Sequence, residues 1–149
     1  MCEENKEKIV LLVGSCGLDR LLTVTKYPDP DAKVRTTAAY NEVGGGNAAN
    51  TASAMGKLTD ASFLKKHNIR IRFLGKVGDD SVGQQLFDEL NDSNVDTTSL
   101  LCLRGPPGST TAFTTIIVSE EEHTRTCIHT PGTCDELTLE DVKERDKPR

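Results

Sequence analysis

The sequence predicts an α/β fold, and three observations lead to that prediction. Residues 9–13 form a continuous apolar run that ends at Gly14, which is typical of a parallel strand buried on both faces. The glycine-rich segment 44–46 leads into a run of small residues that favours a helix packed close to a sheet. Residues 69–74 alternate like a strand, and Asp79-Asp80 then begin a second helical pattern. This strand–helix–strand–helix order is the signature of an α/β domain.

The first strand is followed by a predicted hairpin. Asp19 is expected just past the carboxyl end of that strand. Two amphipathic stretches, 21–25 and 33–43, flank a turn at 27–31 that contains two prolines, which cannot donate to a ladder of strand hydrogen bonds. We expect these stretches to pair partly outside the main sheet.

The two helices are expected over 48–57 and from residue 79 onward. Asn47 stands at or near the N-cap of the first helix. The second has apolar residues at helical spacing, namely Val82, Leu86 and Leu90. The polar stretch 59–68 either prolongs the first helix or forms a surface loop.

Further strands are expected at 95–103, 110–119 and 125–129. The Gly-Pro-Pro-Gly sequence at 105–108 is expected to break the first two of them apart.

Near the last residue, the pattern predicts the start of one more helix. Thr138 and Asp141 resemble a capping box, and Leu137 and Val142 a hydrophobic staple. Only seven residues follow Val142. A helix with so little room to bury a face leads us to expect that the chain is the front part of something longer.

Composition narrows the classes of function. The 149 residues are 36% hydrophobic and 4% aromatic, with a net charge of −5, which fits one globular domain with an aliphatic core. Basic residues are scattered among acidic ones, so we expect neither nucleic acid nor an anionic membrane as a partner. The charged N-terminus precedes only five apolar residues, so no membrane span or signal segment is expected. Five cysteines without a C-x-x-C motif indicate reduced thiols, a cytoplasmic chain and no metal site.

Asp19 and the segment 45–50 are the candidate binding residues. In an α/β fold, ligands bind outside the carboxyl ends of the strands, where Asp19 is expected. Asn47 and Asn50 share one helical face and add two amides to that carboxylate. This set suits a polyhydroxylated neutral ligand such as a sugar. Each feature also has a structural interpretation, because Asp and Asn commonly cap helices and glycines commonly form tight connections.

Other sites fit the sequence less well. Gly44, Gly46 and Ala49 match the dinucleotide pattern G-x-G-x-x-A, but they do not follow the first strand, and no acidic residue ends the next strand. A P-loop is excluded because no Gly-Lys-Ser/Thr follows the glycines. The histidines have no Ser or Cys elbow near them, so no nucleophilic triad is expected.

Taken together, these segments resemble a known family. Val13-Gly14 through Leu18-Asp19, Lys26-Tyr27-Pro28 with Asp31 and Arg35, residues 45–50, and Gly75 through Asp79-Asp80 with Gly83 resemble the N-terminal half of the ribokinase (pfkB) family of sugar kinases. The spacing of the first three is most similar to ketohexokinase-like and fructokinase-like members. The resemblance covers roughly residues 9–143.

The resemblance implies a fold and an activity. The fold is a ribokinase-like three-layer α/β sandwich, here partial, with a small β-sheet lid within about 20–43 and 110–119 that often forms a dimer clasp. The activity is transfer of the γ-phosphoryl group of ATP, with Mg²⁺, to a hydroxyl of a fructose-like ketose or another monosaccharide. The implied sugar-binding residues are Asp19, Gly45, Gly46, Asn47 and Asn50. Asp31 is implied to reach a partner subunit's sugar site, and Arg125 to approach the ATP phosphates.

The chain departs from the family in one decisive respect. The family carries its catalytic base and anion hole in a Gly-Ala-Gly-Asp segment, which this sequence lacks. Family members are also about twice as long. We therefore expect residues 1–149 to be the N-terminal part of the kinase domain, with the ATP-binding and catalytic half absent, no catalytic residue present and no turnover by this chain alone. The alternative is a non-catalytic fragment that binds sugar or pairs with a full-length kinase through the lid. Residues 59–68 look like an insertion relative to the family.

Overall fold

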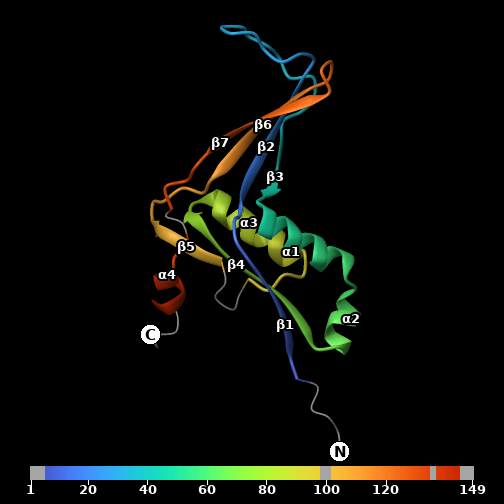
Figure 1. Ribbon diagram of the computed structural model, residues 1–149, viewed down its shortest axis with the longest axis vertical. Helices are drawn as coiled ribbons and strands as arrows, with labels where there is room; N and C mark the ends of the chain where they lie inside the picture. The colour runs from blue at the N-terminus through green and yellow to red at the C-terminus, as the bar shows by residue number, and fades with distance from the viewer. Residues whose placement is uncertain (1–5, 98–101, 135–136, 145–149) are drawn as a thin grey trace, which may run out of the picture.

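The structure is a computed structural model that describes residues 6–97, 102–134 and 137–144. It contains two β-sheets and four helices in those ranges (Figure 1). The strands are β1 (Lys8–Val13), β2 (Gly17–Val24), β3 (Asn41–Gly45), β4 (Ile69–Asp79), β5 (Cys102–Pro107), β6 (Phe113–Ser119) and β7 (Thr124–Thr130). The helices are α1 (Asn47–Leu58), α2 (Ala61–Lys66), α3 (Ser81–Asp92) and α4 (Leu139–Glu144). The predicted α/β class is confirmed.

The first sheet is parallel, with strand order β1-β4-β5, and α1 and α3 pack on one face of it. The hydrophobic core lies between these layers and includes Phe73 from β4 and Leu86 from α3, both almost fully buried. The two helices approach closely at Gly56, where an added Cβ would lie 1.8 Å from the carbonyl oxygen of Ser93. Only glycine permits that approach.

The prediction that β1 is buried on both faces is wrong. Ile9, Leu11 and Val13 are 47%, 48% and 55% exposed. They are in register with the β4 residues that point away from the core. In the described ranges this face of the sheet is covered only near its far end, where Lys76 Nζ pairs with Asp141 of α4 at 3.2 Å. The apolar run indicates a strand, but burial depends on a second layer of helices that the local pattern cannot show.

The second sheet has strand order β3-β2-β6-β7 and carries the predicted hairpin outside the main sheet. Two boundaries differ from the prediction. The residues from 33 to 40 are not a strand, and β3 begins only at Asn41. Asp19 lies inside β2 and not beyond the end of β1, because the chain leaves the first sheet after Val13 and joins the second sheet at Gly17.

Two local features of the first half also refine the predictions. Residues 59–68 form neither a prolonged helix nor a plain loop, because Asp60 starts the separate helix α2 by accepting hydrogen bonds from Ser62 N and Phe63 N. Gly46, not Asn47, is the N-cap of α1, and Asn47 is the first helical residue. Asn47 therefore has its side chain available for a ligand.

In the second half, β5 and β6 are separate strands, as predicted, but β5 extends through the Gly-Pro-Pro sequence to Pro107 instead of ending at residue 103. Proline is tolerated there because β5 is an edge strand of the first sheet, with one side free of ladder bonds. The predicted strand start at residue 95 is wrong, because residues 95–97 hold only the isolated bridge of Asp96 with Arg72; residues 98–101 lie outside the described ranges, and β5 begins at Cys102. The capping box is confirmed by Thr138 N to Asp141 Oδ2 at 2.8 Å and Asp141 N to Thr138 Oγ1 at 3.2 Å. The staple partner Val142 has a side chain outside the described set.

No helix in the described ranges is long and apolar enough to span a membrane.

Candidate sugar-binding site

A cavity of about 550 Å³ lies where the link between β1 and β2, the start of α1 and the second sheet meet. Four segments that are far apart in the sequence contribute to it. They are 15–19, the α1 positions 46, 47 and 50, the β6 region 112–116, and alternate residues of β7. The cavity thus lies between the second sheet and the start of α1.

Gly46 brings the start of α1 to this cavity. Its φ of 96° lies in the region that favours glycine, and a Cβ added here would lie only 2.5 Å from the carbonyl oxygen of Ser15. No other residue type therefore fits at this position. Ala49 N donates to the same Ser15 oxygen at 3.4 Å, so the helix start is fixed beside the link between β1 and β2. The first N–H groups of a helix carry a partial positive charge, and together with the exposed amides of Asn47 and Asn50 they suit oxygen atoms of a ligand.

A row of polar side chains crosses the second sheet on its cavity side. Asp19 of β2 is paired with Thr114 of β6, and Thr114 is paired with His129 of β7, so all three point to the same face. Thr114 Oγ1 and His129 Nδ1 are 3.2 Å apart. A carboxylate, a hydroxyl and an imidazole in one row offer both donors and acceptors to vicinal hydroxyl groups.

The next rows are less polar. Ile116 and Cys127 face the cavity one step along the strands, and Arg125 lies one step further. The cavity therefore passes from hydrogen-bonding groups near α1, through an apolar middle, to a single cationic group at its far end.

Gly45 leaves room for the carboxyl group of Asp19. A Cβ at this position would meet all three carboxyl atoms of Asp19 at 2.6–2.7 Å. Gly45 itself does not line the cavity, and it leaves space for the Asp19 carboxyl group.

Asp80 anchors the segment that leads into β6. Its carboxylate accepts hydrogen bonds from Thr111 N (2.8 Å), Thr111 Oγ1 (2.7 Å) and Gly83 N (2.8 Å). Desolvation raises the pKa of Asp80, but the hydrogen bonds from Thr111 and Gly83, with the charge of Arg104, outweigh it and lower the pKa below its usual range. The next residue along, Ala112, accepts from Leu18 N at 3.1 Å. The N-terminus of α3 thus fixes where β6 enters the cavity.

Of the predicted site residues, Asp19, Gly46, Asn47, Asn50 and Arg125 line this one cavity. Asp31 does not. It is an exposed residue with φ 62° in the loop between β2 and β3, and that loop extends away from the body of the molecule (Figure 1). Its implied role in a partner's site stays a prediction, as do the ligand contacts of the other residues.

Sequence reasoning missed Thr114, Cys127 and His129. A usable signal was present, because Arg125, Cys127 and His129 alternate within a predicted strand and must share a face. What the sequence did not show was which face the cavity occupies.

ATP and Mg²⁺, which the family resemblance implies, fit these residues incompletely. The described ranges hold no cluster of three His, Cys, Asp or Glu side chains that could bind a metal ion, and Arg125 is the one cationic side chain lining the cavity. We derive no step of phosphoryl transfer from this chain.

Comparison with known proteins decides the family. The family model described as pfkB family carbohydrate kinase matches residues 7–148, nearly the entire chain. The chain belongs to the pfkB family of carbohydrate kinases. This confirms the resemblance drawn from the sequence.

Individual proteins are also similar in sequence to this chain. The chain is 27% identical over 93 residues to a ribokinase of Staphylococcus aureus, which covers 62% of this chain and 27% of that protein. It is 35% identical over 128 residues to the bifunctional protein HldE of Magnetococcus marinus, and this match covers 84% of this chain and 24% of that protein. The matched segment thus spans about a quarter of the length of each relative.

Solved structures show the same fold. The ribokinase of Giardia lamblia superposes with a TM-score of 0.73 at 23% identity, covering 93% of this chain and 40% of that one. The ribokinase of Arabidopsis thaliana, solved in complex with ribose and ATP, superposes with a TM-score of 0.67 at 17% identity, covering 92% and 41%. Both likenesses establish the ribokinase fold for the described part of this chain.

Proposed function

We propose that this chain supplies the sugar-binding half of an ATP-dependent sugar kinase. The observation that carries the proposal is the cavity in which Asp19, Asn47 and Asn50 meet the Thr114–His129 row. These groups are hydrogen-bond donors and acceptors with one negative charge, and the cation that lines the cavity, Arg125, lies two steps along β7 from His129. This arrangement favours a neutral polyol over a charged substrate. The substrate proposed is a fructose-like ketose or another monosaccharide.

In this role Asp19 accepts hydrogen bonds from two hydroxyl groups of the sugar, and the amides of Asn47 and Asn50 bind neighbouring hydroxyls. Ile116 and Cys127 pack against the carbon face of the ring. Arg125 stands where an anionic phosphate of ATP would approach the bound sugar. Positioning of this kind is the main contribution a protein makes to phosphoryl transfer, together with electrostatic stabilisation.

The chain is proposed to be inactive alone, because no Gly-Ala-Gly-Asp segment is present to supply the base and the anion hole. An assay that couples ADP formation to NADH oxidation, on material free of host kinases, checks this directly. Turnover of fructose or ribose by the purified chain would overturn the inactivity while leaving sugar binding to be measured separately.

The binding test is a urea melt followed by circular dichroism, with and without a high concentration of fructose or ribose. A ligand that prefers the native state moves the transition to higher urea. We expect the shift in the wild-type chain and in Asp29→Asn, whose exposed carboxylate lies outside the cavity, and its loss in Asp19→Asn. Equal sugar shifts in Asp19→Asn and the wild type would contradict the proposal.

A second function, pairing with another copy or with a full-length kinase through the second sheet, is favoured by exposed apolar side chains on and beside that sheet. Tyr27, Val34, Tyr40 and Ile128 are 39–53% exposed. We propose that this surface forms the dimer clasp, and sedimentation velocity of the chain with and without a full-length homologue measures it. A monomer under both conditions would refute the clasp.

A further inference from the structure

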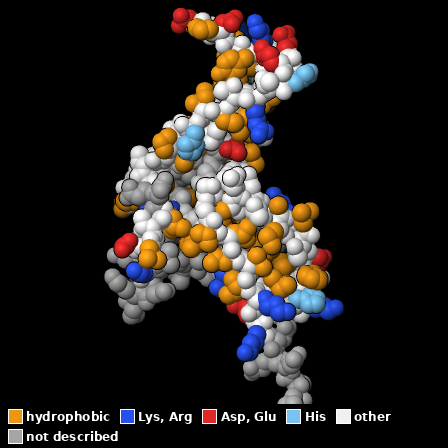
Figure 2. Space-filling view, viewed as in Figure 1, with side chains coloured by type: hydrophobic (Ala, Val, Ile, Leu, Met, Phe, Trp, Pro, Cys, Tyr) orange, Lys and Arg blue, Asp and Glu red, His pale blue; other side chains and the backbone are white. Residues whose placement is uncertain are grey.

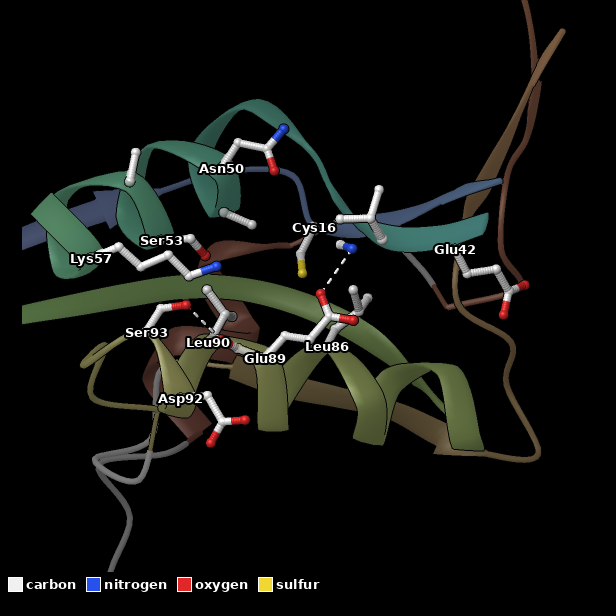
Figure 3. Close-up of a pocket in the computed structure, with 14 residues that line it drawn as sticks. Cys16, Glu42, Asn50, Ser53, Lys57, Leu86, Glu89, Leu90, Asp92 and Ser93 are labelled. Carbon is white, nitrogen blue, oxygen red and sulfur yellow. Dashed lines mark hydrogen bonds between the residues drawn. The ribbon is translucent and has the colours of Figure 1, made fainter. Parts of the chain in front are cut away.

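A second cavity, of about 560 Å³, lies between α1, α3 and strand β3 (Figure 3). It is separated from the candidate sugar site by Cys16 and Asn50, which line both cavities. Nothing in the proposed kinase function uses it.

The walls of this cavity are largely apolar. Leu86 and Leu90 from α3 face Ala49 from α1, and Val43 of β3 closes one end with 44% of its surface exposed. Figure 2 shows hydrophobic side chains gathered over this part of the molecule. A compact apolar group placed here would be removed from water on several sides, which stabilises binding.

One carboxylate projects into the cavity, that of Glu89 on α3 (Figure 3). Glu89 Oε2 accepts from Gly44 N and Oε1 from Gln85 Nε2, both at 2.8 Å. Both donors are neutral, and no Lys, Arg or His among the described residues forms an ion pair with Glu89. A carboxylate has about four lone-pair positions, so each oxygen can accept one more hydrogen bond.

The other charged groups that line the cavity, all among the described residues, form no ion pair with Glu89. Glu42 pairs with Arg20 at 2.9 Å. Lys57 is exposed and its ammonium lies beside Ser53 on the α1 side of the cavity, whereas the exposed Asp92 carboxylate points away from the cavity (Figure 3). Solvent screens the exposed Lys57, so the half-buried carboxylate of Glu89 is the charge that a ligand meets against the apolar walls.

We propose that this cavity binds a small organic amine, with its ammonium group on the Glu89 carboxylate and a compact apolar body against Leu86, Leu90 and Val43. A charge-assisted hydrogen bond to a carboxylate is about twice as strong as one between neutral groups. The apolar walls lower the local dielectric constant and so strengthen the attraction between the two charges. The proposal stands on this cavity alone and is independent of the sugar site.

Benzylamine is the probe, with benzyl alcohol and benzoate as neutral and anionic analogues of the same shape. Each is titrated into the full ¹⁵N-labelled chain while the backbone amide signals are followed by NMR. We expect saturable shifts of Gly44, Leu86 and Glu89 with benzylamine, about tenfold weaker binding of the alcohol, and no such shifts with benzoate.

Two variants and one control locate the site. Glu89→Gln keeps an acceptor for Gly44 N while it removes the charge, and it should weaken benzylamine about tenfold. Asp88→Asn removes the same charge from an exposed position of α3 that contacts Gln84, and it should leave the affinity unchanged. Ser53→Leu fills the cavity from α1 without touching the Glu89 hydrogen bonds, and it should reduce binding even if Glu89→Gln fails to fold.

Equal affinity for benzylamine and benzyl alcohol would overturn the proposal. Unchanged binding in folded Glu89→Gln or in Ser53→Leu would overturn it too, as would shifts confined to the exposed β1 face.

Discussion

The α/β layer and the second sheet of this molecule differ in how they bury their residues. Phe73, Val77 and Ala52 of the first layer are fully buried, whereas every residue of β7 is exposed, and Ser119 is the one buried residue of β6. The same chain thus has a core that carries stability and a thin sheet that carries most of the cavity surface. Substitutions in the two regions should therefore separate folding from ligand binding.

The largest expected effect is in the first layer. Phe73→Ala removes a fully buried ring from β4 and should lower the free energy of unfolding by about 3–5 kcal/mol. Thr115→Ala, a half-buried position of β6, should change it by less than about 0.5 kcal/mol. Urea melts of the two variants measure this difference. Similar losses would mean that the second sheet carries as much of the stability as the core.

The second largest effect on the free energy of unfolding is expected at Asp80, which joins α3 of the first layer to the segment before β6 of the second sheet. Asp80→Ala removes the N-cap of α3 and both hydrogen bonds to Thr111, and should cost about 2 kcal/mol of unfolding free energy. Asp79→Ala, whose exposed side chain lies 3.7 Å from Arg104, should cost less than about 0.5 kcal/mol. A cost for Asp79→Ala as large as that for Asp80→Ala would contradict the anchoring role of Asp80.

The same carboxylate predicts a pH dependence. The pKa of Asp80 is lowered in the folded chain, so its contribution to stability is complete above the ordinary aspartate pKa of about 3.9 and is lost as pH falls through the folded value. Urea midpoints measured from pH 6 down to pH 3 should fall more steeply for the wild type than for Asp80→Ala. Parallel curves would show that Asp80 does not contribute.

A smaller effect is expected on the cavity side of the second sheet. Thr114→Val removes one hydroxyl from the polar row and should weaken sugar binding about three- to tenfold, with a stability change under about 0.5 kcal/mol. Thr115→Val, its neighbour on the opposite face of β6, is the matched control and should leave sugar affinity unchanged. Calorimetric titration with fructose or ribose distinguishes them, and equal affinities would place the sugar elsewhere.

The smallest effect on folding is expected on the outer face. Ile128→Lys replaces a side chain that is 50% exposed and should leave the urea midpoint almost unchanged, while it abolishes any pairing through the second sheet. Sedimentation velocity measures the pairing. Unaltered association of the variant would exclude this face from the clasp.

The sequence predicted what local patterns determine. The helices α1 and α3, the capping box at Thr138, the outer hairpin and the cluster of Asp19 with Asn47 and Asn50 all follow from periodicity, capping and motif spacing. It did not predict the exposed face of β1, because burial depends on elements distant in the chain. It also missed Thr114 and His129, which join Asp19 only through the register of β2, β6 and β7.

Fructose and ribose titrations of the ¹⁵N-labelled chain, followed by amide NMR, test the central claim most directly. We predict saturable shifts at Asp19, Gly46, Asn50 and Thr114 with at least one of these sugars, all lost in Asp19→Asn. Signals that do not move in a folded wild-type chain at saturating sugar, or that move equally in Asp19→Asn, would contradict a sugar-binding role for this cavity.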